Sequence, residues 1–292
     1  QGPMRLTRRD RLVLFAPLAV LLSGWLVLPA LLGLLATFST YSPFSTSIHF
    51  AGLGNYLAVI RDPQFGVAIR NITLFAVSAV PLELVIGFGL AYLLRRPIRG
   101  RGLWRLLLLL PWLVSPIANG VMWHFLLIGA NGILDFASGW LGQASIASPI
   151  GDARLALPTI VAIEVWREAP FVAFLLLPGL LSVPKELWEH ATLDGASWIR
   201  QAYVVALPSL RPLLLAITML LVGLSLGTLD VVLILTGGGP GSATVTPAFY
   251  SYNQAFAVNN WPAGAASAWL IAAAVFGVGL VYIRLVRRPA TA

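Results

Sequence analysis

Three charged residues interrupt an apolar stretch of the sequence near residue 165. Glu164, Arg167 and Glu168 are spaced i, i+3 and i+4, which places them on one face of a helix. One guanidinium fork between two carboxylates can bind the hydroxyl groups of a sugar or polyol through paired hydrogen bonds. The alternative is an internal salt bridge that holds this segment to its neighbours. Charges within such a segment tend to face a bundle interior or a water-filled cavity.

The sequence contains few candidate residues for phosphate binding, metal binding or catalysis. A phosphate-binding Walker A loop needs a lysine in a glycine-rich cradle, and the only lysine, Lys185, follows Ser182-Val-Pro. The three histidines, His49, His124 and His190, do not have metal-ligand spacing, and there is no cysteine. The G-x-S-x-G match at 223–227 lies inside an apolar run, where small residues favour close helix packing. We therefore expect no catalytic site, no metal site and no cofactor in this chain.

Composition decides the class of protein. Hydrophobic residues make up 58% and charged residues 10% of the 292 residues, whereas soluble domains carry about 25% charge. This predicts an all-α integral membrane protein. A membrane-crossing helix needs about 20 apolar residues, and six runs qualify: 12–38, 71–94, 106–128, 157–181, 212–235 and 265–283.

The basic residues predict the orientation. Most of the 19 lysines and arginines fall in segments that an even number of spans places on one side. They are Arg5, Arg8, Arg9 and Arg11; Arg95, Arg96, Arg99, Arg101 and Arg105; Lys185, Arg200 and Arg211; and Arg284, Arg287 and Arg288. By the positive-inside rule both termini are cytoplasmic. The net charge of +8 then sets topology, and we expect no nucleic-acid partner.

The long cytoplasmic connection, 182–211, has a pattern of its own. Residues 186–193 suit a short helix, Gly195 supplies a C-cap or a bend, and Pro208 starts the next helix. Ala191 and Ala196 are small, so that another protein's surface could approach the backbone closely. The residues alone predict an amphipathic helix-turn-helix that lies on the membrane or on a partner.

The same connection resembles the EAA loop of type I ABC importer permeases. Glu189, Ala191, Asp194, Gly195 and Pro208 occupy motif positions, and His190 replaces the usual first alanine. In that family the loop forms a coupling helix that docks on a cytoplasmic ATPase subunit. The resemblance thus implies that these six residues mediate ATPase coupling.

A second motif narrows the resemblance. Leu235-Thr-Gly-Gly-Gly-Pro240 predicts a rigid external turn, and it is similar to the signature of carbohydrate-uptake permeases of the maltose and glycerol-phosphate type. Shorter strings also resemble that subgroup: Phe50–Tyr56, Asp62–Pro63, Leu110–Pro111, Trp166 with Pro170, and Gly264–Ala268. The resemblance covers roughly residues 11 to 288.

The resemblance also assigns a transport cavity. It implies cavity positions for Glu164, Arg167, Glu168 and Phe171 on the fourth span, and for Ser225, Thr228 and Asp230 on the fifth. For Ser225, a helix-packing hydroxyl is an equal alternative. We interpret Glu83, alone in the second span, as an interhelical hydrogen-bonding residue in preference to a solute ligand.

Together these patterns predict a multi-pass permease subunit of a binding-protein-dependent importer in the bacterial cytoplasmic (inner) membrane, with the type I importer permease fold. The implied partners are a second homologous permease, two ATPase subunits that bind ATP and Mg, an extracytoplasmic solute-binding (lipo)protein, a sugar-like solute and membrane lipid. The chain itself is not expected to be an enzyme. The alternative is an ion-coupled secondary transporter of a polar solute.

The predicted organisation has four parts. Residues 1–3 resemble a tag remnant. Residues 4–70 hold the N-terminal segment, the first span and an external segment. Residues 71–288 form a five-helix core that includes the coupling loop, and residues 289–292 form a tail.

Overall fold

The structure, a computed structural model, describes residues 8–40, 49–96, 99–129, 132–140 and 148–286. Within these ranges it contains helices and no β-strand, apart from one isolated bridge between Ser39 and Phe50. The predicted all-helical class is confirmed for these residues. Several predicted features lie outside the described residues: the tag remnant 1–3, Arg5, Arg287, Arg288 and the tail 289–292.

The chain forms two compact units, residues 1–62 with 251–270 and residues 63–250 with 271–292. The predicted division after residue 70 would cut helix α4, which runs unbroken over Pro63–Leu94. The second unit therefore begins about two helical turns earlier than the apolar run suggested, since residues 63–70 continue the helix although they include Gln64 and Arg70.

The first unit is built from short helices and one long apolar segment. The Asn55 side-chain amide closes a turn by donating to the carbonyl oxygens of Thr37 (2.7 Å) and Ser39 (2.9 Å). The elements are α1 (Arg8–Leu22), a π-helical turn (Ser23–Val27), α2 (Leu28–Ala36), α3 (Gly54–Arg61) and a second π-helical turn (Asn253–Ala257).

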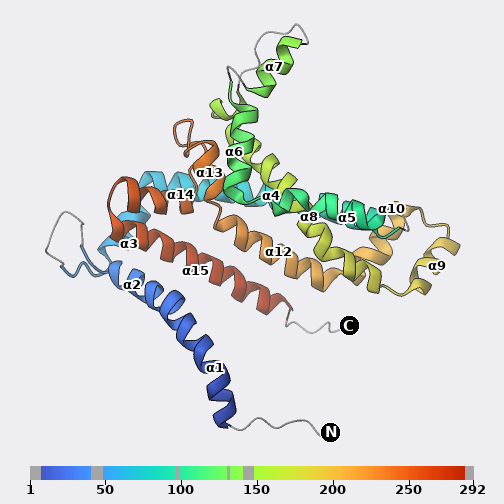
Figure 1. The fold of residues 1–292 in the computed structure, drawn as a ribbon, viewed down its shortest axis with the longest axis horizontal. Coiled ribbons are helices and arrows are strands. Elements are labelled where there is room, and N and C mark those ends of the chain that lie inside the picture. Colours follow the sequence, from blue (N-terminus) through green and yellow to red (C-terminus); the bar gives the residue numbers. More distant parts are fainter. Residues whose placement is uncertain (1–7, 41–48, 97–98, 130–131, 141–147, 287–292) are drawn as a thin grey trace. The chain divides into compact units, whose positions relative to one another are not determined.

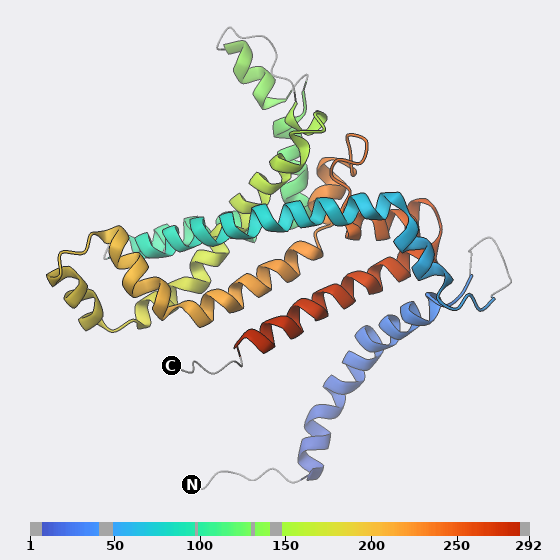
Figure 2. The same ribbon diagram turned by 180° about the vertical axis from the view of Figure 1, so that it is seen from behind.

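The second unit holds the remaining helices (Figures 1 and 2). They are α4, α5 (Arg101–Leu113), α6 (Pro116–Leu127), α7 (Ile133–Trp140), a 3-10 turn (Pro149–Gly151), α8 (Ala156–Ser182), α9 (Lys185–Leu193), α10 (Trp198–Gln201), a π-helical turn (Ala202–Ala206), α11 (Leu207–Ser209), α12 (Arg211–Leu226) and α13 (Asp230–Leu235). Helices α14 (Pro247–Tyr252) and α15 (Trp261–Val286) each contribute residues to both units.

Helices α4 and α8 form the most extensive pair in the second unit. They approach closely because α4 has Gly87 at the contact: a Cβ atom there would lie 2.5 Å from Val172 Cγ1 and 2.9 Å from the Ala169 carbonyl oxygen. Around this contact the core is apolar and includes Leu176 and Leu221, whose side chains are almost completely buried. The pair thus provides a continuous wall against which α5 and α12 pack.

Two of the predicted spans are not continuous helices, and the structure corrects both. The run 106–128 divides into α5 and α6, which meet at 86°, because a residue before proline avoids the helical region and Ser115 precedes Pro116. The Ser115 hydroxyl then accepts the Ala118 N–H and caps α6. The run 212–235 divides at Gly227–Leu229 into α12 and α13.

The second halves of these broken spans pack on each other. Gly120 of α6 leaves room for α13, since a Cβ there would lie 2.9 Å from Ile234 Cβ. His124 of α6 also lies within hydrogen-bonding distance of the Leu235 carbonyl oxygen, with its Nδ1 at 3.0 Å. Thus α6 and α13 form a pair of their own.

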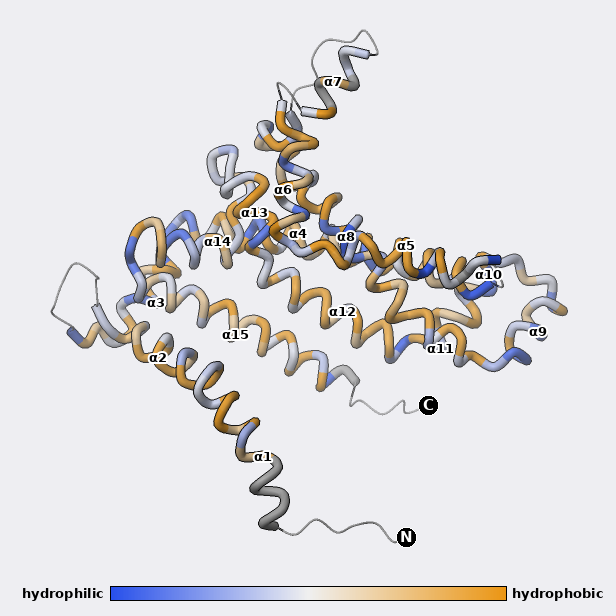
Figure 3. Tube along the Cα trace, in the orientation of Figure 1, coloured by the Kyte–Doolittle hydropathy of each residue, from blue (hydrophilic) through white to orange (hydrophobic). Residues whose placement is uncertain are grey.

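Within the described ranges, three helices are long and apolar enough to cross a membrane: Phe15–Ala36, Pro63–Leu94 and Trp261–Arg284. Counting each strongly bent pair as one span, Gly102–Leu113 with Pro116–Leu127 and Trp198–Ser209 with Arg211–Leu226, gives five. The predicted fourth span, α8, is not among them; hydrophilic residues interrupt its middle (Figure 3). The count of six spans and the side of each terminus remain predictions.

Pro208 does not start a helix, contrary to the prediction. Helical structure runs from Trp198 through Pro208 to Ser209, and the next helix, α12, starts at Arg211 after an 80° bend. A proline inside a helix has no N–H to donate. A π-helical turn, Ala202–Ala206, immediately precedes this proline-containing segment.

Candidate functional site

The three charged residues of α8 form one ion-paired group. A single nitrogen of the guanidinium, Arg167 Nη2, lies 2.9 Å from Glu164 Oε2 and 2.6 Å from Glu168 Oε1. The predicted helical spacing produces this contact. Both ion pairs join residues of α8 itself, so they do not tie α8 to a neighbouring helix.

This group retains unused hydrogen-bonding capacity. Glu164 and Glu168 are only 6% and 7% exposed, yet Glu164 Oε1, Glu168 Oε2 and Arg167 Nε have no hydrogen-bond partner within the described part of the protein. Buried polar atoms in proteins are nearly always paired with protein groups or water, so these three atoms are available to a ligand or to water in the cavity.

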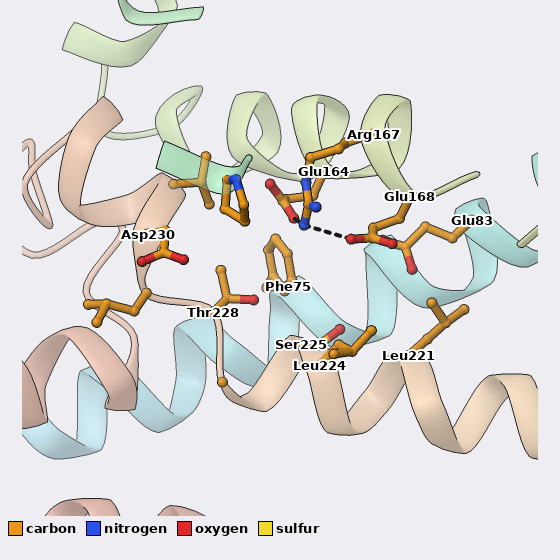
Figure 4. Close-up of a pocket in the computed structure, with 14 residues that line it drawn as sticks. Phe75, Glu83, Glu164, Arg167, Glu168, Leu221, Leu224, Ser225, Thr228 and Asp230 are labelled. Atoms are coloured by element: carbon orange, nitrogen blue, oxygen red, sulfur yellow. Dashed lines mark hydrogen bonds and ion pairs between the residues drawn. The ribbon is translucent and has the colours of Figure 1, made fainter. Parts of the chain in front are cut away.

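A cavity of about 150 Å³ opens beside these atoms (Figure 4). It is bordered by α4, α6, α8, α12, α13 and the residues between α12 and α13. Six of the seven predicted cavity residues line it: Glu164, Arg167, Glu168, Ser225, Thr228 and Asp230. The other lining residues are Phe75, Glu83, Pro116, Leu221, Leu224, Gly227, Leu229 and Val231.

The break between α12 and α13 brings Asp230 into this group. On a continuous helix, Ser225 and Asp230 would point about 140° apart, at 3.6 residues per turn. Instead α12 ends at Leu226 and α13 starts at Asp230, so that both residues and Thr228 face one cavity. The Thr246 hydroxyl satisfies the Thr228 carbonyl oxygen that the break leaves unpaired, at 2.8 Å.

Phe171, the seventh predicted residue, is not among the residues that line the cavity. It shares the face of α8 with Glu164 but lies about two turns further along the helix. There its ring stacks on Trp112 of α5, with centroids 4.5 Å apart and planes at 4°. Its observed contact is therefore with α5.

For Glu83 the structure differs from the sequence-based interpretation. It is 3% exposed and lines the cavity, and no hydrogen bond or ion pair to another helix involves it within the described residues, although we interpreted it as an interhelical hydrogen-bonding residue. A carboxylate alone in an apolar span was the available signal. Phe75, two turns earlier on α4, carried no such signal, because an aromatic residue is ordinary in a membrane helix.

The short helix predicted over residues 186–193 is observed as α9, Lys185–Leu193; its coupling role stays a prediction. Gly195 follows it with φ = +73°, and the Ala196 N–H donates to the Ala191 carbonyl oxygen at 2.9 Å, which is the expected C-cap. Glu189, His190 and Asp194 are exposed. These three polar side chains therefore form an exposed hydrophilic surface at the end of α9.

Ala191 faces the other way. Its side chain is buried and packs with Val183 and Val205 in a small apolar cluster inside the loop. The expectation that Ala191 offers a close approach to another protein is wrong for this conformation, because the loop's own residues occupy that space. Its small size instead lets the helix-turn-helix close.

An aromatic clamp, formed by Tyr92, Arg95, Trp188 and Trp198, connects the end of α4 to this loop. The Arg95 guanidinium lies 3.5 Å from the centroid of the Trp188 ring, and the Tyr92 hydroxyl donates to the Trp198 carbonyl oxygen at 3.0 Å. Burial lowers the pKa of Arg95, but an arginine remains cationic at neutral pH. Helix α4 thus borders the cavity and contacts the loop.

The predicted glycine turn follows α13. Gly237 and Gly238 have φ of +57° and +83°, a region that favours glycine. The Asn71 amide of α4 donates to the carbonyl oxygens of Ser242 (2.9 Å) and Val245 (3.0 Å). These bonds fix the residues after the turn against α4.

Comparison with known proteins gives a family match over most of the chain. The family described as "binding-protein-dependent transport system inner membrane component" matches residues 83–288. The chain is 31% identical to the trehalose/maltose transport system permease protein MalF of Thermococcus litoralis, over 82% of this chain and 80% of that protein. It is 32% identical to the sulfoquinovosyl glycerol transport system permease protein SmoG of Agrobacterium fabrum, over 95% and 91%.

The fold is also similar to solved structures. A chain of a bacterial ABC transporter involved in the import of the acidic polysaccharide alginate superimposes with a TM-score of 0.82, covering 97% of this chain and 98% of that chain, at 19% identity. A chain of a bacterial alginate ABC transporter in complex with an alginate pentasaccharide-bound periplasmic protein superimposes with the same TM-score of 0.82, covering 97% of this chain and 96% of that chain, at 19% identity. At this identity the likeness establishes the fold.

Proposed function

Because the chain belongs to the family of binding-protein-dependent transport system inner membrane components, we propose that it is a permease subunit that passes a carbohydrate or related polyol across the inner membrane by alternating access. The observation that carries this proposal is the polar cavity between membrane helices, with Glu164, Arg167 and Glu168 on one side and Ser225 and Thr228 on the other. Hydroxyls and charged groups of this kind recognise sugar hydroxyls.

The named solutes of similar proteins support a carbohydrate. Two relatives are permeases for trehalose/maltose and for sulfoquinovosyl glycerol, and a third is the sn-glycerol-3-phosphate permease UgpA of Yersinia pestis, 29% identical over 85% of this chain and 84% of that protein. The cavity of one chain is small beside typical ligand pockets of about 300–1,000 Å³. A second, homologous permease subunit would complete the pathway.

The energy source in this proposal is a separate pair of ATPase subunits that bind ATP and Mg. They contact the exposed residues Glu189, His190 and Asp194 around the end of α9, and the permease performs no hydrolysis. Movement of α9 reaches the cavity through the aromatic clamp, since α4 carries Tyr92 at one end and Glu83 and Phe75 at the cavity. An extracytoplasmic binding protein delivers the solute.

Reconstitution tests the proposal. The permease, its companion subunits and the binding protein are placed in liposomes, and uptake of labelled maltose, trehalose, glucosamine and glycerol 3-phosphate is measured with and without ATP. We expect uptake of at least one solute that requires both ATP and the binding protein. Uptake driven by a sodium or proton gradient without ATP would overturn the proposal in favour of an ion-coupled transporter.

A further inference from the structure

The charge of the cavity is strongly unbalanced. Its lining holds four carboxylates, those of Glu83, Glu164, Glu168 and Asp230, against the single guanidinium of Arg167. With all groups ionised the formal charge is −3. A buried charge is costly unless it is paired, so the lining is complementary to a positively charged partner.

The carboxylates are distributed around the cavity and come from three helices. Figure 4 shows Asp230 of α13 at one end and Glu83 of α4 at the other, where Glu83 points toward Glu168 of α8. Arg167 already binds one oxygen of Glu164 and one of Glu168 through Nη2. Asp230 is thus uncompensated at one end of the cavity, and at the other end two carboxyl groups from different helices, those of Glu83 and Glu168, meet.

Two observations indicate that hydrogen-bond acceptors are free where Glu83 meets Glu168. Glu168 is 7% exposed and its Oε2 has no partner. Glu83 is 3% exposed, makes no hydrogen bond or ion pair in the part of the chain that the structure describes, and lines the cavity. Two buried carboxylates from different helices, each with unused acceptor capacity, can receive two of the three N–H groups of one ammonium.

We propose that the transported solute carries an ammonium group, as an amino sugar or amino polyol does, and that this group binds between the Glu83 carboxylate and Oε2 of Glu168. The sugar hydroxyls then face Ser225 and Thr228 on the opposite side of the cavity. This inference rests on the proposed transport function and specifies its solute. An anionic solute at the same place would meet like charges at close range, which is unfavourable.

The test compares two sugars that differ in the charge of one nitrogen. Binding of glucosamine and of N-acetylglucosamine to the assembled permease–ATPase complex in nanodiscs is measured by calorimetry at pH 6, where the amine is protonated. Glucose and glycerol 3-phosphate serve as neutral and anionic probes. We expect glucosamine to bind at least tenfold more tightly than N-acetylglucosamine, and glycerol 3-phosphate to bind most weakly.

Variants assign the preference to the site. Glu83→Gln should remove the difference between the two sugars, Glu83→Asp should retain part of it, and Glu186→Gln on the exposed side of α9 should leave it unchanged. Equal binding of the two sugars, or a preference that survives Glu83→Gln, overturns the proposal. If Glu83→Gln prevents assembly, the same comparison is made with Glu168→Gln.

The ammonium preference and the proposed transport function can fail independently of each other. ATP-dependent uptake of a neutral sugar without any preference for the ammonium group would reject the amino-solute inference and leave the importer intact. An ammonium preference in a complex that transports only with an ion gradient would reject the importer and retain the site.

Discussion

The contact between α4 and α8 at Gly87 gives a quantitative test of how the cavity wall is held. In Gly87→Ala the new Cβ would lie 2.5 Å from Val172 Cγ1, 2.6 Å from Val172 Cβ and 2.9 Å from the Ala169 carbonyl oxygen. Carbon atoms prefer separations of about 3.5–4.0 Å, so the helices must separate by about 1 Å. Val172 cannot move aside, because it is fully buried and a β-branched residue has one favoured rotamer in a helix.

Overpacking of this kind costs about 1–3 kcal/mol, whereas replacing glycine by alanine inside a helix contributes about 1 kcal/mol of stability. The net expectation is a loss of up to about 2 kcal/mol. For a protein of this size about 1 kcal/mol lowers Tm by about 2–4 °C, so Gly87→Ala should lower Tm by up to about 8 °C.

Gly89→Ala is the matched control. It lies two residues away in the same helix, and its Cβ would have no atom within 4 Å, so we expect an unchanged or slightly raised Tm. Thermal unfolding of the purified complex is followed by tryptophan fluorescence for both variants. Adding Val172→Ala to Gly87→Ala should recover only part of the loss, because the Cβ contact remains. Equal stability of the two glycine variants would refute the close packing of α4 on α8.

Three further changes test the coupling loop and the glycine turn. Glu189→Ala should reduce solute-stimulated ATP hydrolysis without reducing solute binding, while Glu186→Ala on the same helix should not; normal stimulation in both would reject the coupling surface. Trp188→Ala removes a cation–π contact of about 0.5–2 kcal/mol and should weaken stimulation in the same assay, and unchanged stimulation would show that the aromatic clamp does not transmit motion. Asn71→Ala removes two hydrogen bonds, so we expect the free energy of unfolding to fall by about 1–3 kcal/mol. Its Tm should be lower than that of Thr73→Ala, whose hydroxyl donates only within its own helix. Equal Tm values would contradict the anchoring role of Asn71.

The family and the chemistry of α8 could be predicted because both depend on local sequence. The i, i+3, i+4 spacing of Glu164, Arg167 and Glu168 suffices to bring them together on any helix. The loop around Glu189 and the turn at Leu235–Pro240 indicated a permease family, which the match over residues 83–288 confirms. Membrane class followed from composition alone.

What the sequence did not provide is the set of contacts between helices. Phe171 shares a face with Glu164, but only the position of Trp112 on another helix decides that its ring stacks there. Glu83 and Glu168 lie 85 positions apart in the sequence and belong to different helices, and periodicity within one segment cannot align two segments. The breaks before Pro116 and at Gly227 were missed for another reason: each apolar run was interpreted by its length, although a proline and a glycine mark these two points in the sequence.

The interruptions in the two broken spans both lie on one side of the cavity, and unbroken helices form the other side. Helices α4 and α8 pass the cavity as single rods, locked at Gly87, whereas α6 and α13 each begin at an interruption that borders the cavity, at Pro116 and after Leu229. Since α6 and α13 are also packed on each other, a displacement of either helix would carry the other with it relative to α4 and α8. A solute held by residues of α4 and α8 would then keep these contacts while the paired helices α6 and α13 change position.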